Sequence, residues 1–279
     1  MGPVASLLFA AAFWGLVWYP LRLLEAAGLS GPWMLAASYA AAFIVLSAVG
    51  WPGTAGMERH RGRLLLMAVA AGWTNLGFVL AMLEGAVARV LILFYLSPVW
   101  TVALGRLFLG ERLTRATLLS LLLGLAGALL MLWTPELGRG APSWADLAAV
   151  TSGFAFAVAN VLTRGLSDLD VRQKTLVSWA GVVVLSLAVA GFSPIPTAPP
   201  AAWGGAVLLG ACGFLAATLA VIHGVSRMPV RRSAVILLVE IPVGALSAWW
   251  LAGEHLSLHE WLGGGMILLA GLIAVGERA

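Results

Sequence analysis

Long apolar runs dominate the sequence, and each one ends at a charge or at turn-forming residues. One crossing of the membrane hydrocarbon core needs about 20 apolar residues. Ten runs fit this template, at residues 4–24, 33–50, 64–83, 88–108, 115–133, 145–163, 175–192, 203–225, 231–251 and 260–276. The pattern predicts an all-α integral membrane protein with ten transmembrane helices.

The composition agrees with this prediction. Of the 279 residues, 61% are hydrophobic and only 10% are charged, and the mean hydropathy is +0.99. A soluble domain carries roughly 25% charged residues, so this chain lacks the polar surface that water requires. The basic residues fall in short clusters between apolar runs, so we expect no nucleic-acid partner and a lipid bilayer around the chain instead.

The positions of the basic residues predict the orientation of the chain. If the N-terminus is cytoplasmic, thirteen Lys and Arg residues fall on the cytoplasmic side, and Arg22, Arg89 and Arg139 fall outside. Cytoplasmic loops of membrane proteins carry such an excess of basic residues. We therefore expect a multi-pass protein of a bacterial-type inner membrane with both termini in the cytoplasm.

An apolar run with one internal proline occurs in each half of the chain. The first run contains Pro98 and closes on Gly110-Glu111, and the second contains Pro242 and closes on Gly253-Glu254. The prolines lie 144 residues apart and the Gly-Glu pairs lie 143 apart. Since this period is about half the chain, the sequence predicts a duplication, with Pro98 and Pro242 as matching hinges. We interpret the two glutamates as loop ion pairs at helix boundaries.

The duplication divides the chain into repeats at residues 1–136 and 143–279, which together form a single integrated membrane domain. Each repeat contains five predicted helices, and because five is odd, the second repeat must enter the membrane inverted. Inverted repeats are typical of secondary transporters, whose substrate site lies near the membrane midplane. A duplicated scaffold without a transport role is the alternative.

Several short motifs resemble those of a known family. Gly110 to Thr114 (GERLT) and Gly253 to Ser257 (GEHLS) resemble the ends of EamA repeats in the drug/metabolite transporter superfamily. Phe13-Trp14-Gly15 and Ser152-Gly153 stand where such repeats begin. Within the superfamily the chain is most similar to the YddG-type bacterial exporters of aromatic amino acids. The resemblance implies ten helices in two inverted halves and outward transport of amino acids or related metabolites.

Glu240 is the one acidic residue deep inside a predicted span. A charged side chain at this depth costs about 2.5–3.5 kcal/mol on insertion scales and is a functional candidate for that reason. It can serve as a proton site or as a contact for a substrate ammonium group. It can equally be a hydrogen-bonded glutamic acid that holds helices together.

Other polar and aromatic residues reach a similar depth, whereas Asn160 and His223 lie near the cytoplasmic ends of the sixth and eighth predicted spans. We expect the first, third, fourth, sixth, eighth and ninth spans to line the substrate path. If their helix faces converge, they form an aromatic-walled cavity with a few polar anchors, suited to an apolar side chain that bears a zwitterionic head. For each aromatic residue, packing at an interface or helix seam is the alternative, and for His223 it is an ordinary hydrogen-bonded role. These candidate substrate-path residues are Trp14, Trp18, Asn75, Phe78, Met82, Tyr95, Ser97, Asn160 and His223.

Motifs for enzymatic catalysis, ATP hydrolysis and metal binding do not occur in the sequence. We therefore predict a secondary transporter that is not an enzyme, needs no cofactor or metal and functions as a monomer. Its predicted activity is export of aromatic or large neutral amino acids and related metabolites by alternating access. Export of cationic drugs or other amphipathic metabolites is the alternative, since it would also use Glu240. An intramembrane lipid enzyme and a nucleotide-sugar carrier are disfavoured, because the spans lack paired acids and deep basic residues.

Overall fold

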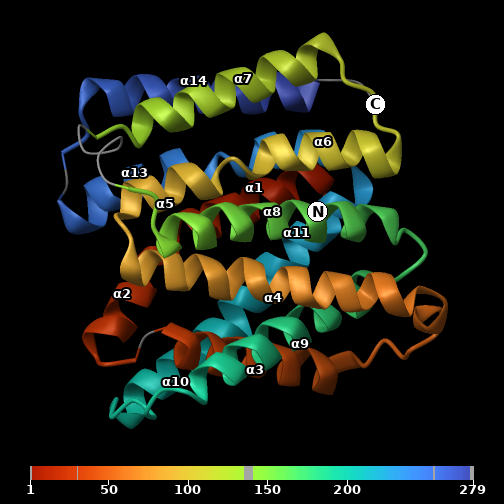
Figure 1. The fold of residues 1–279 in the computed structure, drawn as a ribbon, viewed down its shortest axis with the longest axis vertical. Coiled ribbons are helices and arrows are strands. Elements are labelled where there is room, and N and C mark those ends of the chain that lie inside the picture. The colour runs from red at the N-terminus through yellow and green to blue at the C-terminus, as the bar shows by residue number, and fades with distance from the viewer. Residues whose placement is uncertain (1, 30, 135–140, 254, 277–279) are drawn as a thin grey trace.

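The computed structural model describes residues 2–29, 31–134, 141–253 and 255–276, and these residues form helices without any strand (Figure 1). Outside these residues lie the predicted end of the first repeat at residue 136 and Glu254. The same is true of two arginines used to predict the orientation, Arg139 and Arg278. In chain order the elements are α1 (Pro3–Leu16), α2 (Trp18–Ala26), α3 (Gly31–Gly50), η1 (Met57–His60), α4 (Arg61–Glu84), α5 (Val87–Phe94), α6 (Ser97–Leu109), α7 (Arg115–Met131), α8 (Trp144–Gly165), α9 (Val171–Ala190), α10 (Pro200–Leu208), η2 (Leu209–Phe214), α11 (Leu215–Arg227), α12 (Val230–Leu237), α13 (Glu240–Ala252) and α14 (Leu258–Gly276).

Nine helical segments in the described part of the chain are long and apolar enough to cross a membrane. They coincide with nine of the predicted spans. The remaining predicted span, 115–133, contains α7, a shorter apolar helix of 17 residues. At 1.5 Å per residue, α7 rises roughly 26 Å, slightly less than a hydrocarbon core of about 30 Å. The prediction of an all-helical membrane protein is confirmed.

The helices run side by side across Figure 1, with α7 and α14 along one edge and α3, α9 and α10 along the other. Between these edges, α1 packs against α11 and α13, while α8 packs against α4, α5 and α6. The first helix of each half of the chain thus contacts the proline-containing segment of the other half. This exchange of partners joins the two halves into one bundle.

Glycines permit the closest of these contacts. A Cβ atom on Gly15 of α1 would come within 2.6 Å of the Glu240 carbonyl oxygen, and one on Gly153 of α8 would come within 2.6 Å of the Phe94 carbonyl oxygen. Both glycines belong to the motifs with which the two halves begin. Their physical role is to let backbones approach, as small residues do between membrane helices.

Both proline-containing spans are interrupted close to the prolines. The first breaks at Tyr95-Leu96, between α5 and α6, and the second at Leu238-Val239, between α12 and α13. Proline has no N–H, and its ring clashes with the carbonyl of the preceding turn, so a straight helix cannot pass through it. The breaks are tight turns in which a carbonyl accepts a hydrogen bond from the N–H three residues later. In the second break, the Ile241 N–H donates to the Leu238 carbonyl at 3.0 Å.

The start of α1 and the end of α14 lie at the same end of the bundle. A side chain on Gly224, in the last part of α11, would meet the Pro3 carbonyl. The Arg232 guanidinium donates to the carbonyls of Ala274 and Val275 at 2.7 and 2.8 Å. We call this the arginine-rich end, because the loops here carry most of the basic residues of the chain.

Glu111 links the two halves at the arginine-rich end. Its carboxylate accepts from the backbone N–H groups of Val230 and Arg231 at 2.8 and 3.4 Å, and lies 3.5 Å from the Arg231 guanidinium. It therefore caps the N-terminus of α12, where backbone donors and the helix dipole both favour a negative charge. Its ionic partner belongs to the other half of the chain and is not one of the arginines beside it in sequence.

Lys174, near the start of α9, is buried at the same end, with only 1% of its surface exposed. Its ammonium group donates to the Ser226 hydroxyl at 2.7 Å and to the carbonyls of Thr163 and Leu166 at 3.1 and 3.3 Å. These three acceptors satisfy the donors of the buried cation. Lys174 thus ties together the ends of α8, α9 and α11.

Candidate functional site

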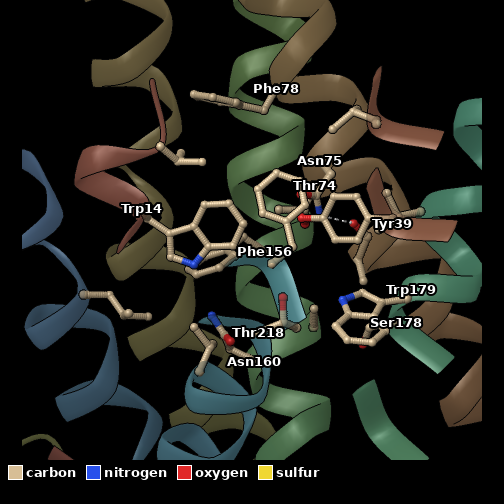
Figure 2. Close-up of a pocket in the computed structure, with 18 of the residues that line it drawn as sticks. Trp14, Tyr39, Thr74, Asn75, Phe78, Phe156, Asn160, Ser178, Trp179 and Thr218 are labelled. Atoms are coloured by element: carbon tan, nitrogen blue, oxygen red, sulfur yellow. Dashed lines mark hydrogen bonds between the residues drawn. The ribbon is translucent and has the colours of Figure 1, made fainter. Parts of the chain in front are cut away.

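A cavity of about 280 Å³ lies inside the bundle, and both proline-adjacent breaks contribute to its wall. Its lining comes from α1 to α5, α8, α9 and α11 to α13. Aromatic rings from both halves of the chain form much of the wall (Figure 2). These rings belong to Trp14, Tyr39, Phe78, Phe94, Tyr95, Phe156, Trp179 and Phe214.

Three of the rings form a continuous stack. Phe214, at the end of the π-helical turn η2, stacks on Tyr39 with ring centroids 4.9 Å apart and on Trp14 at 5.4 Å. Offset and edge-to-face aromatic pairs stabilise packing beyond the area they bury, by about 0.5–1.5 kcal/mol. The stack gives this side of the cavity a rigid apolar surface.

A second aromatic cluster surrounds Phe94, the last residue of α5. Its ring centroid lies 4.8 Å from that of Phe78, 5.7 Å from that of Tyr95 and 5.9 Å from that of Phe156. The break after α5 places Phe94 and Tyr95 together at the cavity. The cavity wall thus contains two aromatic clusters, which offer apolar ring surfaces to a ligand.

The polar groups of the wall fall into two kinds, and Asn75 represents the first. Its side-chain oxygen accepts from the Tyr39 hydroxyl at 2.6 Å, a bond drawn in Figure 2, and its amide nitrogen donates to the Ala71 carbonyl at 2.9 Å. Thr74 similarly donates to the Ala70 carbonyl at 2.8 Å. These groups are already engaged within the protein and hold the wall in shape.

Asn160 and Thr218 are of the second kind. Figure 2 shows both side chains in the same part of the cavity, from α8 and α11. Neither side chain makes a hydrogen bond to any residue that the structure describes, although Asn160 is only 6% exposed. Thr218 is half-buried, and because both side chains face the cavity without such a partner, they are open to a ligand.

Glu240 supplies the only carboxyl group among the described lining residues. It is the first residue of α13, immediately after the break, and its carboxyl group interacts with the Tyr95 hydroxyl. The two proline-adjacent breaks thus bring a phenol from one half and a carboxyl from the other together. A single acidic group in an aromatic cavity can attract a cation or an ammonium group.

Six of the predicted substrate-path residues line the cavity, namely Trp14, Asn75, Phe78, Tyr95, Asn160 and Glu240. The other four lie outside it in this structure. The Trp18 indole donates to Ser247 at 2.8 Å, and the His223 ring lies 2.8 Å from the Arg227 guanidinium. Met82 packs beside a small core cluster, and Ser97 is buried at the start of α6.

Several lining residues were not predicted from the sequence, notably Tyr39, Phe156, Trp179, Phe214 and Thr218. Tyr39 and Trp179 lie on the second and seventh predicted spans, which were not expected to face the path. Both residues have polar atoms in the middle of an apolar run, and that signal could have indicated them.

A bundle of membrane-length helices around an internal cavity with unpaired polar groups is typical of a small-molecule membrane transporter. The EamA-like transporter family model matches the chain twice, at residues 2–133 and 143–276. The chain therefore belongs to the EamA-like transporter family.

Curated relatives agree with this assignment. An uncharacterized transporter of Archaeoglobus fulgidus is 31% identical over 218 residues, which cover 77% of this chain and 76% of the relative. A probable terminal-alkyne amino-acid exporter of Streptantibioticus cattleyicolor is 28% identical over 99% of this chain and 93% of its own length. A riboflavin transporter of Rhizobium johnstonii is 26% identical over 77% and 68% of the two chains.

The fold also occurs among solved structures. A crystal structure described only as that of a protein superimposes with a TM-score of 0.82 and 19% identity, over 98% of both chains. At that identity the likeness concerns the fold alone.

Proposed function

We propose that this transporter exports aromatic or large neutral amino acids and related amphipathic metabolites from the cytoplasm. The observation that carries the proposal is the wall of the cavity, which combines two aromatic clusters, one carboxyl group and polar side chains without hydrogen-bond partners in the described protein, among them Asn160 and Thr218. Aromatic surfaces suit a large apolar side chain, and the carboxyl group suits an ammonium group. The relative named as an amino-acid exporter, which matches over almost the whole chain, also supports this class.

Alternating access is the proposed mechanism. In this interpretation ten helices form two inverted halves, the cavity near the midplane opens to one side at a time, and the breaks beside Pro98 and Pro242 absorb the bending. A monomer suffices, because the cavity is lined within one chain. We place the arginine-rich end in the cytoplasm of a bacterial-type inner membrane, following the distribution of basic residues.

Export of cationic drugs is the second candidate. Glu240 favours it, because an acidic group in an aromatic cavity would bind a cation even if that cation carried no carboxylate of its own. Anionic substrates such as nucleotide-sugars are disfavoured, since the described lining residues include no Lys, Arg or His.

Uptake into proteoliposomes tests the proposal. Purified protein would be reconstituted and supplied with labelled phenylalanine, tryptophan, leucine or threonine, with and without a pH gradient. We expect uptake of phenylalanine, tryptophan and leucine above that of protein-free vesicles. Ala159→Trp is the matched control, because Ala159 lines the cavity and an indole there would fill it. Saturable uptake of a lipophilic cation with none of the amino acids would instead support the second candidate.

A further inference from the structure

The cavity wall contains hydrogen-bond donors without partners. Asn160 carries two amide N–H donors and a carbonyl oxygen, and Thr218 carries a hydroxyl. Neither side chain has a hydrogen-bond partner in the described part of the chain, and both line the cavity. Because both side chains face the cavity and have no partner in the described protein, a ligand with complementary atoms can pair with them.

Neighbouring groups show that the helices could have satisfied these side chains internally. Thr163, one turn after Asn160 on α8, donates to the Met67 sulfur at 3.7 Å. Thr175 of α9 donates to the Val171 carbonyl of its own helix at 2.8 Å. A threonine in a helix commonly forms this back-bond to its own backbone. Thr218 does not form it, and its hydroxyl remains available to the cavity.

We propose that Asn160 and Thr218 form a subsite for the carboxylate of a zwitterionic substrate, while Glu240 receives the ammonium group. This inference rests on the proposed function. The donors are neutral, so they do not compensate a free anion, but a zwitterion brings its own ammonium group as a counter-charge. A cation without a carboxylate leaves the amide and the hydroxyl unpaired. The subsite therefore selects amino acids over the corresponding amines.

Direct transport of a substrate and its analogue tests this selectivity. Labelled phenylalanine and labelled phenethylamine, which lacks the carboxylate, would be compared in proteoliposomes. We expect the unaltered protein to transport phenylalanine with at least a tenfold higher kcat/KM. Asn160→Leu and Thr218→Val should raise the KM for phenylalanine about tenfold and leave that for phenethylamine within twofold. Thr175→Val is the matched control, since its hydroxyl bonds only within its own helix.

Asn160→Asp distinguishes recognition from loss of folding. The side chain keeps its shape but offers acceptors in place of donors, so it repels a carboxylate and attracts an ammonium group. We expect this variant to lose phenylalanine transport while transport of phenethylamine is retained or increased.

Three outcomes would overturn the inference. Phenylalanine transport that is unchanged in Asn160→Leu and Thr218→Val would show that these residues do not bind the carboxylate, with the proposed function intact. Loss of both substrates in Asn160→Asp would point to a structural role. If the unaltered protein transports the amine alone, the amino-acid function fails together with the subsite.

Discussion

Glu240 has the most unusual position of any single residue in the chain. It stands at the first position of a helix in the interior of the bundle, on the cavity wall, with Tyr95 of the other half beside it. Insertion of such a group is costly, and the local fold does not use it as a structural ion pair. Its position agrees with a role in substrate or proton binding.

We expect Glu240→Gln to abolish the pH dependence of transport, because an amide neither takes up nor releases a proton. Initial rates of uptake would be measured from about pH 5 to about pH 8, the range in which physiological pH sensors titrate. We expect the rate of the variant not to change across this range. Glu84→Gln, at an exposed helix end, should keep the profile of the unaltered protein. If the Glu240→Gln variant kept the pH dependence of the unaltered protein, Glu240 would have no proton-coupling role and would remain a substrate contact only.

Glu111 has a structural position, in which its carboxylate caps the N-terminus of another helix. We expect Glu111→Ala to lower the free energy of unfolding by about 2 kcal/mol, because α12 loses its cap and Arg231 loses an ionic partner. Thermal unfolding in detergent would measure this. Glu111→Gln retains an acceptor for the Val230 N–H and should lose less, and Glu58→Ala, with an 82% exposed side chain, should lose nothing. Equal stability of all three variants would contradict the capping role.

At the scale of elements, the interrupted helices are the main functional feature. The turns at Tyr95-Leu96 and Leu238-Val239 divide two membrane-length spans into two shorter helices each. The turn in each span precedes a proline by two to four residues, where the helix has already lost a backbone hydrogen bond. If these turns act as the proposed hinges, bending there moves the lining residues Tyr95 and Glu240.

Alanine at Pro98 or Pro242 should slow transport several-fold while the protein stays folded, because a restored hydrogen bond stiffens the helix. Single-turnover uptake together with thermal unfolding would separate the two effects. Slower uptake with an unchanged melting temperature would show that the prolines are needed for the transport movement and not for stability. Normal uptake in both variants would reject the hinge role.

The α7–α14 pair provides a test of close helix packing. A Cβ atom on Gly263 would come within 2.6 Å of the Gly127 carbonyl oxygen, whereas one on Gly265 of the same helix meets nothing within 4 Å. We expect Gly263→Ala to destabilise the protein by about 1–3 kcal/mol through overpacking, and Gly265→Ala to leave it unchanged. Thermal unfolding of the two variants would check the difference, and similar melting temperatures would contradict the observed contact.

At the scale of the whole molecule, the two halves are interleaved. Tyr95 of the first half meets Glu240 of the second half at the cavity wall, and Glu111 joins the halves at the arginine-rich end. The cavity therefore exists only when both halves are assembled. A movement of one half against the other must change access to it.

Reporter fusions would determine the orientation of the molecule. We expect alkaline phosphatase fused after Ser193 to be active and the same enzyme fused after Met228 to be inactive, because the basic residues near α11 and α12 hold that end in the cytoplasm. A fluorescent protein at the C-terminus should fold and fluoresce. The reverse pattern would invert the molecule in the membrane, and equal activities would contradict the predicted number of crossings between these positions.

The helices were largely predictable, and the cavity was predictable in part. Apolar runs long enough to cross a membrane must form helices there, because lipid offers no partners to the backbone. Asn75, Tyr95 and Glu240 could be selected by their depth in a span, and Asn160 as a polar residue nearer the end of one, since polar groups in apolar runs are conspicuous. Tyr39 and Trp179 were not, because their spans were not expected to face the path.

The sequence by itself determined the membrane class, the positions of the helices, the duplication and the two prolines near which spans are interrupted, whereas the turn residues themselves came from the structure. These properties follow from local hydropathy, from proline geometry and from short motifs that act within one segment. Only the tertiary structure decided which residues meet, such as Tyr95 with Glu240 and Glu111 with Arg231. Partners separated by more than a hundred residues depend on how whole helices pack, and packing is set by the fit of many side chains at once.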